Sequence, residues 1–189
     1  MDYTPKIARH IDFGLAKPSD NYKAIKGPSY IDGLPSEKEW LDFLNIIENP
    51  GTKEFAELWR EKYQAANGIP HRQDFDFETL VKYGKHLVIY KRNEEGRWFT
   101  TFCGDRIVEE IKLELSHKYI DDYADEETIK FWMTNIQQIT QQCTPIFEIF
   151  TLEYTKEHHK TSHSLNLPLK SGADGSVDMF ICHEFFLYI

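Results

Sequence analysis

Three histidines near the C-terminal end of the chain have side chains that could bind a metal ion: His158, His159 and His163. His159 and His163 are four residues apart, the spacing that places two ligands on one face of a helix. The residues between them, Lys160-Thr161-Ser162, are typical of a turn that leads into a strand, where four residues span ~13 Å. We therefore expect a solvated hairpin tip here and no metal site.

Acidic residues form two further groups, Glu109-Glu110 and a run over residues 121–127. Such carboxylates could carry out acid–base chemistry or bind calcium. The run (Asp121, Asp122, Asp125, Glu126 and Glu127) lacks the ligand spacing of a calcium loop and contains no glycine for its sharp turn. Acids at the start of a helix are favoured by the helix dipole. We interpret both groups as solvated, helix-capping faces.

Catalytic motifs are not recognisable in the sequence, which has no glycine-rich phosphate loop and no nucleophile elbow. The three cysteines, Cys103, Cys143 and Cys182, are far apart and lie in apolar or helical contexts. They are expected to be buried thiols rather than disulfides, metal ligands or nucleophiles. No catalytic residue is predicted, although catalytic groups brought together only in space would escape this reading.

His183 is the polar side chain that we expect to face a cavity, because it shares one predicted strand face with Met179 and Ile181. A core histidine with a satisfied hydrogen bond is the alternative for it, and plain core is the alternative for the apolar candidates. The cavity is predicted between the inner sheet face and a helix over residues 126–142, where large apolar side chains converge. The predicted ligand-binding residues are Phe102, Trp132, Ile136, Leu165, Leu167, Met179, Ile181 and His183.

The composition is that of an ordinary globular protein, with 41% hydrophobic residues and a net charge of −9 over 189 residues. This negative charge disfavours nucleic acids and anionic membranes as direct partners. The N-terminal residues include no apolar run as long as a signal peptide or a membrane span requires. We expect a cytoplasmic protein.

The N-terminal part of the chain is predicted to be an arm followed by two helices. Residues 1–35 are rich in proline and glycine and show no sustained periodicity, which is typical of a loop-like arm. Ser36 and Glu39 form a capping box that begins a helix over residues 36–48. Asn49-Pro50-Gly51 interrupts this helix, and Thr52 is expected to cap a second one over residues 53–66. We divide the chain into 1–52 (arm and first helix) and 53–189 (main domain with its flanking helix).

The main domain is expected to contain five strands, over residues 87–91, 98–103, 145–154, 161–170 and 177–188. Gly104 ends the second strand, and the helical elements follow between the second and third. The predicted fold class is α+β: a five-stranded antiparallel sheet with short helices on one face, preceded by the arm and two helices.

Several fragments, in the same order and at similar spacing, resemble the PAS-like family common in alpha-proteobacteria. They are LWR at 58–60, IPHRQDFD at 69–76, GDRIVE at 104–109, KYID at 118–121, Pro145, LPL at 167–169 and DGSVD at 174–178. The resemblance covers about residues 54–189. Two family glycines fall on Lys112 and His117, and a family proline falls on Phe77. Because glycine reaches backbone angles that other residues adopt only at a cost, the helical connection near the pocket is expected to be shaped differently here.

The resemblance implies a sensory or protein-interaction module. Our first hypothesis is a regulatory domain that binds a small, mainly apolar ligand between sheet and helices and signals through a protein partner or a second copy of itself. The second is an interaction or dimerisation module whose cavity is filled by its own side chains, and the third is a small enzyme.

No haem or flavin cofactor is expected. The predicted helix over residues 126–142 contains no histidine to ligate haem, and its Met133 is a weaker ligand. The PAS families that use flavin photochemistry imply a cysteine in a helical motif, whereas Cys103 and Cys182 fall on predicted strands.

Two surfaces are candidates for the partner: the first two helices, with Trp40, Phe43, Ile47, Phe55 and Trp59, and a sheet face with Phe180 and Phe186. Alternatively, these helices cover that sheet face within one monomer.

Overall fold

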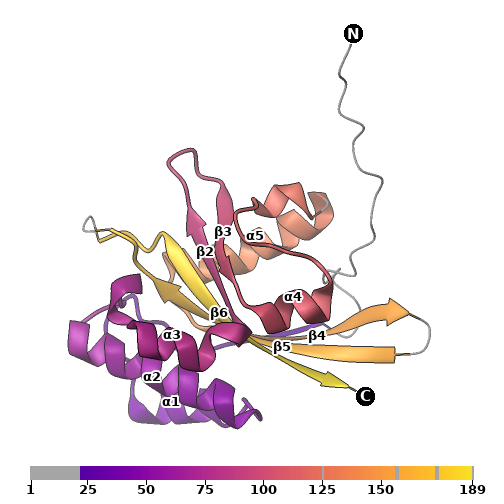
Figure 1. Ribbon diagram of the computed structural model, residues 1–189. Coiled ribbons are helices and arrows are strands. Elements are labelled where there is room, and N and C mark those ends of the chain that lie inside the picture. The colour runs from indigo at the N-terminus through magenta and orange to yellow at the C-terminus, as the bar shows by residue number, and fades with distance from the viewer. Residues whose placement is uncertain (1–21, 125, 156–157, 173–174, 189) are drawn as a thin grey trace.

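A single antiparallel sheet with helices on both faces forms the chain, as seen in a computed structural model that describes residues 22–124, 126–155, 158–172 and 175–188 (Figure 1). The α+β class is confirmed. The helices are α1 (Glu37–Leu44), α2 (Pro50–Ala66), α3 (Phe77–Tyr83), α4 (Asp105–Ile111) and α5 (Glu126–Gln141). The strands are β1 (Lys23–Lys26), β2 (Leu87–Arg92), β3 (Trp98–Cys103), β4 (Ile146–Thr155), β5 (His158–Leu169) and β6 (Met179–Tyr188). Their order in the sheet is β1-β4-β5-β6-β2-β3.

The strand β1 lies within the predicted arm. With it, the sheet of the described residues has six strands, whereas five were expected. It pairs with β4, where Ile25 lies opposite Phe147. Its sequence, KAIK, has only one large apolar residue and therefore lacks the alternation of apolar and polar residues that would predict a strand. Further along the arm, Tyr30 is buried with its ring edge-on to Trp59. The arm therefore packs on the domain from residue 22 onward.

The first two helices begin at strong capping residues. The Ser36 capping box is confirmed: the Glu39 amide donates to Ser36 Oγ at 3.3 Å, and the Ser36 amide donates to Glu39 Oε2 at 2.9 Å. The second helix starts earlier than predicted, because Asn49 rather than Thr52 is its cap. Pro50 then occupies the first turn, where its missing N–H costs nothing.

Both faces of the sheet are covered, by α1 and α2 on one side and by α4 and α5 on the other (Figure 1). Trp40 and Trp59 are fully buried in the first of these layers. The first two helices thus cover the sheet within one chain, which was the alternative to a partner surface, but the sheet face named in that alternative was wrong. They cover the face that bears Met179 and Ile181 and not the face with Phe180 and Phe186.

The connection from β3 into α4 depends on a close backbone approach at Gly104. A Cβ at this position would lie 2.2 Å from the Gly84 carbonyl oxygen and 2.5 Å from that of Lys85, which excludes any side chain. After α4, Lys112 and His117 have φ angles of 57° and 62°. These are the two positions where the family has glycine, and both keep the left-handed backbone that glycine favours. That this connection differs in shape from the one in the family stays a prediction.

Candidate functional site

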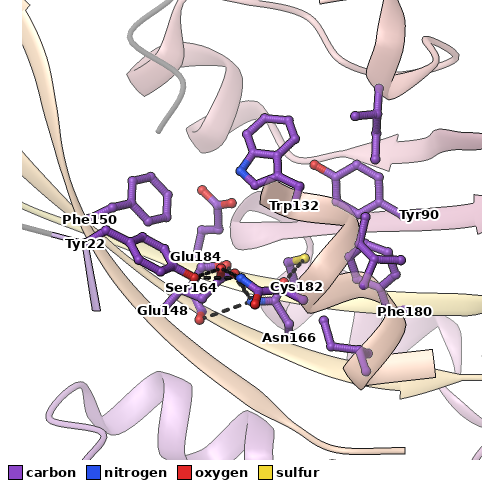
Figure 2. A pocket seen from close by; sticks show the side chains of 14 residues that line it. Tyr22, Tyr90, Trp132, Glu148, Phe150, Ser164, Asn166, Phe180, Cys182 and Glu184 are labelled. Atoms are coloured by element: carbon purple, nitrogen blue, oxygen red, sulfur yellow. Dashed lines mark hydrogen bonds between the residues drawn. The ribbon is translucent and has the colours of Figure 1, made fainter. Parts of the chain in front are cut away.

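A pocket of about 80 Å³ lies between α5 and the centre of the sheet (Figure 2). The helix is the one expected from the sequence, but the sheet face is the opposite of the predicted one. Apolar and aromatic side chains form most of its wall: Tyr22, Tyr90, Ile120, Trp132, Ile136, Ile139, Phe150 and Phe180. Its base is polar and consists of Asn135, Glu148, Ser164, Asn166, Cys182 and Glu184.

The polar base follows from the alternation of three central strands. Side chains two residues apart on a strand share a face, which places Glu148 (β4), Ser164 (β5) and Glu184 (β6) on the α5 side. These three residues are also in register, since Glu148 pairs with Ser164 and Ser164 pairs with Glu184. Two interstrand gaps separate the glutamate backbones by ~10 Å. The two carboxylates thus face one pocket from either side of Ser164.

Glu148 is the centre of a hydrogen-bond network that joins the strands to α5 (Figure 2). Its Oε1 accepts from the Tyr22 hydroxyl at 2.5 Å and from Asn135 Nδ2 at 2.7 Å, and its Oε2 accepts from Asn166 Nδ2 at 2.7 Å. All three donors are neutral. Burial raises the pKa of Glu148, and the hydrogen bonds oppose this shift.

Glu184 lies in the same pocket without such support. Among the described residues, none donates a hydrogen bond to its carboxylate or forms an ion pair with it. Burial, and secondly the nearby Glu148, raise the pKa of Glu184 to about 7. The side chain is only partly accessible and lines the pocket, so the pocket is where its charge meets solvent or a ligand. Glu184 is therefore the group in this site whose charge changes near neutral pH.

Cys182 completes the base as a buried, protonated thiol. Its Sγ donates to Asn166 Oδ1, and burial raises its pKa well above the usual value. Cys103 is also buried, on β3, and burial raises its pKa to about 12. Both thiols are disfavoured as thiolates and hence as nucleophiles.

The sequence-predicted site residues do not form one site. Trp132 and Ile136 line the pocket. Leu165, Leu167, Met179, Ile181 and His183 lie on the opposite sheet face, where α1 and α2 cover it. Phe102 is 40% exposed and borders a separate groove beside Leu80 and Met179.

The face assignment was wrong because β6, MFICHEFFLY, carries apolar residues in both alternating sets. Each face of the sheet is buried under helices, so that alternation in this strand does not indicate which set faces α5. The set that does so contains Phe180, Cys182 and Glu184.

His183 has the environment of a core histidine. Its Nδ1 lies 3.1 Å from Thr52 Oγ1, and its ring stacks on Phe55 with centroids 5.3 Å apart. Burial, and secondly the neighbouring His86, lower the pKa of His183 to about 3, which keeps the ring neutral. The alternative of a satisfied core histidine is the one that the contacts support.

Several of the other histidines and acidic residues singled out in the sequence can be placed in the structure. Among the residues described, no group of three or more His, Cys, Asp and Glu side chains is arranged to hold a metal. His163 is buried edge-on to Phe147, while the side chains of His158 and His159 lie outside the described part. Asp121 forms an ion pair with Arg97 at 2.8 Å.

Glu110 differs from the solvated face predicted for it, because its side chain is 2% exposed. It forms ion pairs with Arg106 and Lys160 and accepts from the Tyr188 hydroxyl. These partners join α4 to the ends of β5 and β6 and compensate the buried charge.

Sequence reasoning missed the polar base of the pocket. Glu148, Asn166 and Glu184 each interrupt an apolar stretch in a central strand: IFEIF, LNL and CHEFF. A polar residue in the middle of a strand that is buried on both faces is the signal that could have found them. Tyr22 carried no such signal, since it lies in the arm.

The family model described as PAS domain matches residues 47–181, which is more than half of the chain. No curated protein and no solved structure showed significant similarity to it. Over the described residues, no helix has the length and apolarity needed to cross a membrane.

Proposed function

The chain belongs to the PAS domain family, whose members are generally sensory rather than catalytic, and from this premise we propose that it is a ligand-binding sensory module. The ligand occupies the pocket between α5 and the sheet, and the signal passes to a protein partner. The observation that carries the proposal is the pocket itself, which combines aromatic walls with an unpaired carboxylate at the centre of the sheet. We further propose a cytoplasmic location, which agrees with the ordinary globular composition of the chain.

The network around Glu148 supports a route by which occupancy of the pocket reaches the surface. Glu148 is bonded to Tyr22, which precedes β1, and to Asn135 on α5. Asn135 also donates to the Tyr22 hydroxyl at 2.7 Å. A ligand that alters the position or charge of the carboxylates thereby acts on the arm and on α5 together.

The walls of the pocket agree with a ligand that is apolar over much of its surface, but the base requires polar recognition as well. Its volume of about 80 Å³ is well below the ~300–1,000 Å³ typical of sites for drug-sized molecules. The ligand is accordingly small.

An interaction module without a ligand is the second candidate, and the small volume of the pocket is the observation that favours it. Phe77 and Val81 lie one turn apart on α3 and are 79% and 66% exposed, which gives a protein partner an apolar surface. A small enzyme is the third candidate, favoured by two titratable carboxylates that face one pocket.

Native mass spectrometry of gently purified protein, followed by extraction, tests the ligand. We expect a bound small molecule in the wild type and in Phe102→Ala, which alters the separate groove. Ile136→Trp, which fills the α5 pocket, is expected to lose the molecule while retaining a cooperative thermal transition. A wild-type protein without any bound mass would support the interaction module instead. Release of a chemically altered molecule during incubation would support the enzyme.

A further inference from the structure

We infer, on the basis of the proposed function, that the pocket is built for a small organic cation, an alkylammonium of a few non-hydrogen atoms. Glu184 is its charge partner, with Glu148 nearby, and the aromatic rings of Trp132 and Phe150 form the walls beside it. The inference rests on the juxtaposition of two carboxylates and aromatic side chains in one pocket.

The charges around the pocket favour a cation. Both ionisable acids of the site face it, and among the described residues that line it there is no lysine, arginine or histidine. Glu148 has three neutral donors, and Glu184 has no partner within the described structure. A desolvated carboxylate without a counter-charge is costly, and a bound ammonium group removes this cost.

Other ligand charges fit these surroundings less well. An anion would lie beside two carboxyl groups and would meet no lysine, arginine or histidine among the described residues that line the pocket. A neutral apolar molecule would take water away from Glu184 and return no hydrogen bond, which leaves its carboxyl group without a partner in either protonation state. A primary ammonium brings one positive charge and three donors to the single unpaired acceptor group.

The aromatic walls suit the organic part of such a ligand. Tyr90 and Phe180 stack on one another, with ring centroids 4.7 Å apart, and close one side. Figure 2 shows the Glu184 carboxylate pointing to the side of the pocket where Phe150 and Trp132 lie. Aromatic faces attract cations, and the interaction is stronger where water is excluded.

The volume limits the size of the ligand. An apolar cavity of ~150 Å³ holds benzene, and a water molecule occupies ~30 Å³ in the liquid. The pocket, at about 80 Å³, therefore holds ~3 atoms of that size. Ethylammonium, with two carbons and one nitrogen, is a probe of matching size and charge.

The test is a titration of the full-length ¹⁵N-labelled protein, followed at the indole N–H of Trp132, which is assigned with Trp132→Phe. The probes are ethylammonium chloride, ethanol, sodium acetate and potassium chloride, at constant ionic strength. We expect a saturable shift with ethylammonium, with an affinity at least about tenfold above that of each other probe. Glu184→Gln should weaken ethylammonium about tenfold or more. Glu94→Gln, which removes the same charge in the exposed turn between β2 and β3, should have no effect.

The outcomes distinguish the inference that the ligand is an organic cation from the proposal that the pocket binds a ligand at all. If ethanol or acetate binds as tightly as ethylammonium, or if Glu184→Gln leaves its affinity unchanged, the cation inference is overturned and a ligand pocket remains. If potassium binds as tightly as ethylammonium, the inference that the cation is organic is overturned, and the pocket is an inorganic cation site. If no probe binds while native mass spectrometry finds a bound molecule, the inference fails and the proposed function stands. If neither experiment finds a ligand, both fail.

Discussion

A carboxylic acid at the centre of a sheet carries its charge at a cost that depends on its neighbours. Glu148 and Glu184 share one pocket, yet only Glu148 is surrounded by donors. Because of this difference, the Glu148 carboxylate is held in place by its donors, whereas the Glu184 carboxylate is free to bind a ligand or a proton. Such an arrangement stores a local instability at the place where a ligand would bind, which is common at functional sites.

The first prediction concerns Glu184→Gln and the pH dependence of stability. The pKa of Glu184 rises from near 4.5 in the unfolded chain to about 7 in the folded protein. Between these values the folded state binds more protons, so this group makes the wild type less stable as pH rises from about 4.5 to about 7. The variant lacks this loss, so its free energy of unfolding relative to that of the wild type should increase by on the order of 2 kcal/mol between pH 5 and pH 8.

Urea unfolding of both proteins at pH 5 and pH 8 provides the measurement. The contribution of His183, whose pKa is lowered to about 3, is lost as pH falls below its usual value of 6.5. Because His183 is present in both proteins, its effect cancels in the difference. A difference between variant and wild type that is the same at both pH values would contradict the assignment of the raised pKa to Glu184.

At the scale of the element, sequence patterns predicted where strands and helices lie better than which way they face. The strand over residues 98–103 and the Ser36 capping box were found as predicted, because local rules decide them. The orientation of β6 was not predicted correctly. Both of its faces are buried, so the alternation of its side chains does not indicate which set faces α5. The strand β1 was missed because its backbone pairing with β4 leaves little trace in side-chain type.

The second prediction concerns Gly104, where β3 turns into α4. Gly104→Ala places a methyl group against the backbone carbonyl of Gly84, which has no side chain that could yield. We expect a loss of about 2–4 kcal/mol in the free energy of unfolding. Gly68→Ala is the matched control, since a Cβ there meets nothing within 4 Å, and its effect should stay within ~0.5 kcal/mol. Equal urea midpoints for the two variants would refute the close approach at Gly104.

At the scale of the whole molecule, the two faces of the sheet differ in character. The α1–α2 side is a packed aromatic core, with Trp40, Phe55 and Trp59 fully buried. The α5 side holds the pocket and its polar network. The fold class and the helix beside the pocket could be predicted from periodicity and from the PAS resemblance. The polar base could not, because its residues come from three strands and α5 and are brought together by the sheet register and the packing of that helix.

The central claim, that a ligand is held on the α5 face of the sheet, is tested most directly by hydrogen–deuterium exchange. Gently purified protein is compared with the same protein after it has been unfolded, freed of small molecules and refolded. Because a ligand protects the elements that it contacts, we predict faster exchange in α5 after ligand removal, with α2 unchanged. Identical exchange in both samples, or a difference confined to α2, would contradict the claim.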